Sequence, residues 1–317
     1  MGIRIFAYRT WMGLAALSLP AASTATDVSV QQWEIGMEVR ATGLCTGIVA
    51  TLPVPMDWPE QRVRVLHEHR TEQVTGLRYR TLGDGVQQLV ISIPRLEAGD
   101  TAEVRLRLEI ARRPVRAPSE THDFRIPARI SRELRPFMGN SPLIETTHPQ
   151  IRALADQIVQ EPSGAWQQVE AIYDWVLENI EYEFDEELQG ALAALQTGRG
   201  DCEERTSLFI ALCRNMGVPA RSVWVPGHCY PEFYLEDSSG QGHWFPCQSA
   251  GERQFGAMDD LRPVLQKGDE FRVPGEREAK RYVAETFRAR HASVPPQVRF
   301  IRRQLVSEEG TDLGCSI

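Results

Sequence analysis

Two residues of this 317-residue chain have the types and surroundings for nucleophilic chemistry, Cys202 and His228. Cys202 follows a Gly-Arg-Gly-Asp turn and precedes an amphipathic segment, so it is expected to begin a helix. At a helix start, the dipole and the free backbone N–H groups stabilise a thiolate and can form part of an oxyanion hole. Because a cysteine nucleophile needs a base, and the base needs an orienting acceptor, a nearby histidine is required.

His228 is a better candidate base than His243. His228 begins a predicted strand, which is a rigid position, whereas His243 lies beside a polar turn, where histidines are common and idle. At this point Cys202 could still be a nucleophile, half of a disulfide or a core residue. The three acids around it, at positions 201, 203 and 204, are expected to face solvent, although one of them could contact substrate.

The N-terminus has the three-part pattern of a secretory signal. Arg4 and Arg9 precede a short apolar run and a stretch of small residues, with cleavage expected after Ala25. The run is shorter than the roughly 20 residues that span a membrane, no cysteine follows it closely, and no later stretch could span. The chain is therefore expected in the periplasm or outside the cell, with no membrane span after cleavage.

The composition is that of a globular protein, with 42% hydrophobic and 25% charged residues. The net charge of -8 argues against nucleic acid as the main partner. In an oxidising compartment six cysteines permit disulfides, but none are spaced as CxxC, so a zinc site is not predicted. His67 and His69 could ligate a metal but are expected to be exposed polar residues. No metal or cofactor is predicted.

The hydrophobic pattern divides the chain into two structured parts. After the signal (1–25), residues 26–115 alternate apolar and polar in six or seven short strands, which predicts a β-sandwich. A connector rich in Pro, Arg and Ser (116–147) leads to a second part (148–256) with four helical segments and three strands. The remaining extension (257–317) is expected to contain a strand at 270–275 and a helix at 276–291.

Residues 148–250 resemble the core of the transglutaminase-like superfamily. The resemblance rests on "GDCEERTSLFIALCRNMGVPARSVWV", "HCYPEFYL" and "WFPCQ", which match a Gly-x-Cys helix start, an Arg-x-x-Gly-hydrophobic-Pro-Ala-Arg segment, a His-x-aromatic-x-Glu strand and a Trp-x-Pro-x-Asp strand. It implies a papain-like α+β core with a Cys-His-Asp triad, behind the β-sandwich often found in exported bacterial members. The expected fold class is therefore α+β, with an N-terminal β-sandwich and a transglutaminase-like core.

The resemblance assigns Cys202 as nucleophile and His228 as base, but it meets Gln248 where the family usually has Asp. A glutamine carbonyl can hold the imidazole ring but cannot neutralise an imidazolium. Papain-like proteases tolerate an amide here. The motif aromatics Tyr230 and Trp244 become candidate substrate contacts.

Strand geometry suggests a disulfide. If His228 and Gln248 face each other across an antiparallel pair, the turn falls near 236–240 and Cys229 lies directly opposite Cys247. Prolines in both strands could shift this register and leave both thiols free.

The sequence thus predicts an exported thiol enzyme that transfers or hydrolyses acyl groups of peptide or protein amides, with hydrolysis favoured. An inactive binding or scaffold protein is the alternative that Gln248 favours. A further enzymatic alternative is the removal of peptide-linked glycans, which would use the same three catalytic side chains.

Overall fold

The computed structural model describes residues 28–159 and 164–305. The expected signal and Cys315 lie outside these residues. Within them, no helix is long and apolar enough to cross a membrane.

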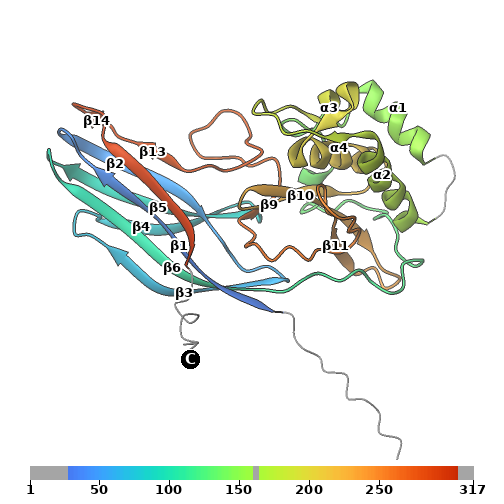
Figure 1. Cartoon of the computed structure of the whole chain (residues 1–317), viewed down its shortest axis with the longest axis horizontal. Helices are drawn as coiled ribbons and strands as arrows, with labels where there is room; N and C mark the ends of the chain where they lie inside the picture. Colours follow the sequence, from blue (N-terminus) through green and yellow to red (C-terminus); the bar gives the residue numbers. More distant parts are fainter. Residues whose placement is uncertain (1–27, 160–163, 306–317) are drawn as a thin grey trace, which may run out of the picture.

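The N-terminal part is built from two antiparallel sheets that enclose one core (Figure 1). Its strands are β1 (Ser29–Arg40), β2 (Cys45–Val54), β3 (Gln61–Arg70), β4 (Gly76–Leu82), β5 (Val86–Leu96) and β6 (Thr101–Arg112). In β6, every second residue from Ala102 to Ile110 is buried, as the two-residue period of a strand requires. These side chains meet those of β1, β2 and β5 in one hydrophobic cluster, so both sheets are held by a shared core.

The C-terminal segment returns to these two sheets. Its strands are β13 (Thr286–Arg288), β14 (His291–Ala292) and β15 (Gln297–Leu305). β15 pairs with β1, while β13 and β14 pair with β2, giving the orders β15-β1-β6-β3 and β13-β2-β5-β4. The return covers the edges that β1 and β2 would otherwise expose. Residues 257–305 are thus shared between both parts of the molecule, as Figure 1 shows in orange and red.

The helix predicted at 276–291 is not formed. This segment is irregular up to Glu285 and then enters β13. Val283 is buried against Phe271, and Phe287 packs on the core of the two sheets, so tertiary contacts override a helix-favouring composition. The strand predicted at 270–275 is reduced to a single bridge between Phe271 and Lys280.

The second part is an α+β unit, as predicted. Its helices are α1 (Pro149–Ile158), α2 (Ala165–Asn179), α3 (Ala191–Thr197) and α4 (Cys202–Asn215), and its main sheet has the order β11-β10-β9-β12. The strands are β9 (Ala220–Val225), β10 (His228–Glu236), β11 (Gly242–Pro246) and β12 (Gln266–Lys267). A short parallel pair, β7 (Glu181–Tyr182) and β8 (Arg199–Gly200), lies beside the start of α4.

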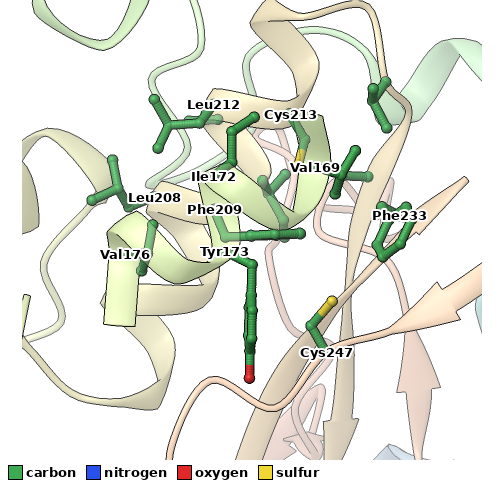
Figure 2. Close-up of a cluster of buried hydrophobic side chains, with 14 of the residues drawn as sticks. Val169, Ile172, Tyr173, Val176, Leu208, Phe209, Leu212, Cys213, Phe233 and Cys247 are labelled. Carbon is green, nitrogen blue, oxygen red and sulfur yellow. The ribbon is translucent and has the colours of Figure 1, made fainter. Parts of the chain in front are cut away.

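Helix α4 is the centre of this unit, because it packs against the other three helices and against β9 and β10. Figure 2 shows the cluster between α2, α4 and β10, where Tyr173, Phe209 and Phe233 meet. Cys213 and Cys247 point into the same cluster and are fully buried. Both are free thiols of the core, which agrees with the interpretation of Cys213 as a small hydrophobic residue.

The connector lies along the second part rather than free in solvent. Just before the connector, Val115 forms a bridge with Met258 of the extension, and within the connector Arg125 forms one with Glu236 at the end of β10. Further on, the connector contains a short 3-10 helix, η1 (Arg135–Phe137). These contacts tie the crossing segment to the unit that carries the thiol.

Candidate active site

Cys202 is the first residue of α4, as predicted, and a capping box fixes it there. Asp201 is the N-cap: its carboxylate accepts the backbone N–H of Glu203 at 2.6 Å, while Glu204 accepts the backbone N–H of Asp201 at 3.0 Å. Gly200 leaves room for Glu204, because a Cβ at position 200 would lie 2.5 Å from the Glu204 Cβ. Local contacts within the sequence Gly-Asp-Cys-Glu-Glu therefore place Cys202 at the N-terminus of α4.

The prediction that the neighbouring acids face solvent is wrong for two of them. Asp201 and Glu204 are buried and form the capping box just described. Glu203 is partly buried and lies 3.3 Å from the guanidinium of Arg281, which comes from the C-terminal segment. Asp201 and Glu204 thus accept hydrogen bonds at the helix cap, and Glu203 pairs with Arg281.

His228 and Gln248 meet beside the thiol. His228 is the first residue of β10, and its Nε2 lies 2.7 Å from the side-chain oxygen of Gln248. Gln248 is held by its backbone: its N–H donates to Gln254 at 2.9 Å, and its carbonyl accepts the hydroxyl of Tyr173 at 2.8 Å. The His228 side chain also forms a hydrogen bond with Cys202.

The surroundings of Cys202 favour its ionised form. A hydrogen bond from the Cys229 side chain lowers the pKa of Cys202 most, burial opposes it, and the hydrogen bond and charge of His228 lower it further, to about 5. For His228, burial lowers the pKa, but the hydrogen bond and charge of Cys202 and the hydrogen bond to Gln248 outweigh burial and raise it. Thiolate and imidazolium therefore stabilise each other.

The predicted register of β10 and β11 is wrong by two residues. Phe233 pairs with Phe245, and Glu232 with Pro246, so the backbone N–H of Cys247 meets the carbonyl of Pro231.

The structure consequently does not bring Cys229 and Cys247 together. Where Cys247 was expected, Ser249 donates its hydroxyl to the Cys229 carbonyl at 2.9 Å. Both cysteines are free: Cys229 lies against Cys202, and Cys247 lies in the core.

The two aromatic residues proposed as substrate contacts do not lie at the thiol. Tyr230 is 1% exposed, and its hydroxyl accepts a hydrogen bond from Arg112 of β6 at 3.1 Å. Trp244 is half-buried and stacks on the guanidinium of Arg221 at 4.0 Å, beside Phe137. Tyr230 thus contacts the N-terminal part through Arg112, although its ring lies 6.3 Å from that of His228, and Trp244 lines the cavity at the junction of the two parts.

The remaining motif residues form buried ion pairs. Glu232 accepts Arg221 at 2.9 Å and Lys267 at 2.6 Å, and Lys267 also lies 2.7 Å from Glu60 of the N-terminal part. Burial raises the pKa of Glu232, but Lys267 and Arg221 outweigh burial and lower it. The glutamate of the His-x-aromatic-x-Glu motif is thus a structural anchor between the sheet of the core and the N-terminal part.

A hollow of about 340 Å³ opens beside His228. Its lining residues are Tyr182, Gly227, His228, Gln248, Ala250, Gly251 and Arg262. Arg262 donates to the carbonyl of Pro226 at 3.0 Å and is paired with Asp260 at 2.5 Å. Sequence reasoning missed Tyr182 and Arg262, because neither lies in a motif; the pairing of β7 with β8 is what brings Tyr182 alongside Gly200.

The thiol is largely covered. Cys202 is 9% exposed and packs with Trp224, while Tyr282 of the C-terminal segment covers this cluster. The ring of Tyr282 lies 5.2 Å from that of Trp224, centroid to centroid. The C-terminal segment therefore forms part of the wall around Cys202.

Among the described residues, no group of three or more His, Cys, Asp or Glu could hold a metal ion. The larger cavity of about 630 Å³ lies at the junction of the two parts, and neither Cys202 nor His228 lines it.

Comparisons with known proteins bear on the core and on the overall fold. Residues 152–249 match the profile of the family described as the Transglutaminase-like superfamily. The crystal structure of a putative cysteine protease from Cytophaga hutchinsonii is similar over 89% of this chain and 93% of its own chain, with a TM-score of 0.57 and 15% identity. A weaker similarity, to the crystal structure of a putative protease from Parabacteroides distasonis, extends over 67% of this chain and 47% of that chain. Its sequence identity is 10% and its TM-score is 0.28. No curated protein matches the chain.

The core of this chain, over residues 152–249, is similar to the transglutaminase-like superfamily, and its fold is similar to that of the Cytophaga hutchinsonii structure. The predicted α+β fold, with a transglutaminase-like core behind a strand-rich region, is confirmed.

Proposed function

We propose that the protein is an exported thiol enzyme that cleaves amide bonds of peptides or proteins. The observation that carries this proposal is the chain of contacts from Gln248 through His228 to Cys202 at the N-terminus of α4. The family and the fold support a thiol enzyme, and the N-terminal sequence pattern supports export to the periplasm or beyond.

The first half of the reaction forms an acyl-enzyme. The Cys202 thiolate attacks the amide carbonyl carbon, a C–S bond forms, and the carbonyl electron pair moves to the oxygen. The N–H of Cys202 is aimed at this oxyanion, because an N–H in the first turn of a helix has no acceptor within the helix. His228 gives its proton to the amide nitrogen, the C–N bond breaks, and the amine leaves.

The second half returns the free enzyme. Water enters beside His228, which removes a proton as the oxygen attacks the thioester carbon. The C–S bond breaks, a carboxylic acid leaves, and the thiolate–imidazolium pair is restored. An amine in place of water would give cross-linking by the same steps. We favour water because the hollow beside His228 is open to solvent and small, at about 340 Å³.

Gln248 holds the ring of His228 without adding charge. Its side-chain oxygen also accepts the N–H of Ala250 at 3.4 Å, so the amide is fixed with its oxygen toward the imidazole. In this role the Gln248 amide orients His228. The ion pair between Cys202 and His228 then depends on the other contacts of the Cys202 sulfur.

The test is turnover of a fluorogenic peptide library by the purified mature protein, with and without an added alkyl amine. Cys202→Ala should abolish turnover, whereas the matched core variant Cys213→Ala should retain it. Turnover that survives Cys202→Ala would refute the proposal. Peptide binding by both proteins with no turnover in the wild type would instead support the scaffold alternative.

A further inference from the structure

An exposed segment of apolar and acidic residues begins at the hollow beside His228. Every residue from 181 to 188 is either acidic or apolar, and all of them are exposed. The apolar residues are Tyr182, Phe184 and Leu188, which are 51%, 70% and 60% exposed. Single exposed apolar residues are ordinary, but several large ones gathered on one segment are typical of a contact surface. Residues 181–188 are called the acidic–apolar segment below.

Tyr182 joins this segment to the hollow. The pairing of β7 with β8 places Tyr182 beside Gly200, two residues before Cys202. Tyr182 lines the hollow of about 340 Å³ together with His228. The guanidinium of Arg205 lies 5.5 Å from the centre of the Tyr182 ring, and its N–H groups donate to two backbone carbonyls. The ring is therefore held in place from one side, while about half of the residue stays accessible to a ligand.

The aromatic and acidic side chains at the start of the segment lie on opposite sides. Glu181 and Glu183 both reach Arg199, at 3.9 and 3.0 Å. The backbone stays extended up to Glu183, whose N–H donates to a carbonyl of β8 at 3.2 Å. Because successive side chains of an extended segment alternate, Tyr182 lies on the side away from Arg199, and Phe184 follows it. The two aromatic residues thus continue the surface of the hollow outward.

The charge of the segment indicates what can bind there. Arg199 pairs with the first two glutamates. Within residues 28–159 and 164–305, no cationic side chain forms an ion pair with Asp185, Glu186 or Glu187. Their negative charge therefore remains available at the surface, next to exposed apolar side chains. A ligand that carries positive charge beside an apolar group is complementary to both features.

We propose that the acidic–apolar segment binds polypeptides in which an apolar side chain stands beside Lys or Arg, and thereby selects such sequences as substrates. The inference rests on the proposed function in one respect, which is that the ligand is a polypeptide whose amide bond is cleaved at Cys202. The apolar side chain packs on Tyr182 and Phe184, and the neighbouring cation meets the carboxylates of 185–187. A peptide with acidic residues at the same place is rejected, because like charges would face each other.

The experiment compares three fluorescein-labelled peptides of equal length. The first alternates Lys and Phe, the second has Ser in place of each Phe, and the third has Glu in place of each Lys. Binding is measured by fluorescence anisotropy with mature Cys202→Ala protein, so that no peptide is cleaved during the measurement. We expect the Lys-Phe peptide to bind roughly tenfold more tightly than either of the others. Among library peptides that the wild type cleaves, kcat/KM should follow the same order.

Substitutions in the segment test its two features separately. Phe184→Ser removes apolar contact area and should weaken binding of the Lys-Phe peptide about fivefold at every salt concentration. Glu186→Lys with Glu187→Lys reverses charge and should weaken binding about tenfold at low salt but much less in 1 M salt, because salt screens exposed charges. The matched controls Val294→Ser and Glu72→Lys, both exposed on the N-terminal part, should leave binding unchanged. Thermal midpoints check that each variant is folded.

The outcomes separate this inference from the proposed function. Equal binding of the three peptides, or binding that both segment variants leave unchanged, overturns the inference. Equal binding of the Lys-Phe and Lys-Ser peptides also overturns it, because charge alone would then explain the attraction. Cleavage by the wild type without these preferences refutes the substrate class and leaves the proposed function intact. Binding that depends on the segment, with no cleavage of any peptide, supports the binding surface and overturns the proposed function.

Discussion

Replacing Gln248 by Glu places a carboxylate where an amide now contacts the imidazole of His228. The two side chains have the same length, so the 2.7 Å contact between the side-chain oxygen and His228 Nε2 can be kept. The new negative charge stabilises the imidazolium, so the pKa of His228, already raised by its contacts with Cys202 and Gln248, should rise further.

The size of this shift follows from the geometry. Two unit charges about 4 Å apart interact by about 4 kcal/mol at an effective dielectric constant of about 20. Both side chains are only partly buried, and solvent screening with the desolvation of the carboxylate should remove about half of this energy. The remaining roughly 2 kcal/mol corresponds to an increase of about 1.5 pKa units for His228.

The assay is a pH titration of the His228 ring by NMR, with wild type, Gln248→Glu and Gln248→Ala. We expect the Glu variant to titrate about 1.5 units above wild type and the Ala variant below it, because Ala removes the oriented acceptor. The limb at which turnover falls with rising pH should move in the same directions. Identical His228 titrations in all three proteins would refute the reasoning, since residue 248 would then have no influence on the imidazole.

Three further predictions follow from other contacts. Gly200→Ala forces a Cβ onto Glu204, so the capping box should weaken, with about 1–2 kcal/mol lost from the free energy of unfolding in urea and slower labelling of Cys202. Glu232→Ala leaves Arg221 without a carboxylate and Lys267 with Glu60 alone, and should cost about 3–5 kcal/mol, whereas Glu109→Ala on the exposed strand pair should cost under about 1 kcal/mol in the same measurement. Because the pKa of Glu232 is lowered, its contribution should disappear as the pH falls through that lowered value. Tyr282→Ala should accelerate labelling of Cys202 by a bulky maleimide more than by iodoacetamide, because Tyr282 covers the thiol cluster; equal acceleration would contradict that role.

Elements whose apolar residues repeat with one clear period could be predicted from the sequence. In α2, the predicted stripe that includes Trp166, Val169, Ile172 and Tyr173 is buried. The turn before α4 was equally clear, since Gly, an N-cap Asp and a Glu three residues on form a capping signal in the sequence itself. For that reason the position of Cys202 at a helix start was predictable.

The register of β10 and β11 could not be predicted from the hydrophobic pattern. A slip of one residue turns every side chain to the other face, but a slip of two preserves the faces, so alternation cannot tell the two registers apart. The turn decides: Asp237 accepts the backbone N–H groups of Ser239 and Gln241 at 2.9 and 3.0 Å, which places the turn one residue later than expected. The disulfide prediction failed for this reason alone.

Contacts between distant segments could not be predicted from the sequence either. The sequence offers Cys229 as half of a disulfide. Nothing in the sequence shows that Cys229, the second residue of β10, contacts the start of α4. Tyr282 packs on the cluster that contains Cys202, and Arg281 pairs with Glu203, both from a segment whose composition favours a helix. Such placements depend on how the C-terminal segment returns to the N-terminal sheets, and no local pattern records that path.

The central claim is that Cys202 and His228 form a thiolate–imidazolium pair. The most direct measurement is the rate of iodoacetamide labelling of Cys202 at pH 6, without reduction, in wild type and in His228→Ala. The contacts of Cys202 lower its pKa to about 5, so wild type should label at nearly its full rate at pH 6, and the loss of His228 should slow labelling at least tenfold. Equal slow labelling of both proteins, rising only near pH 8.5, or a Cys202 that is already in a disulfide would contradict the account.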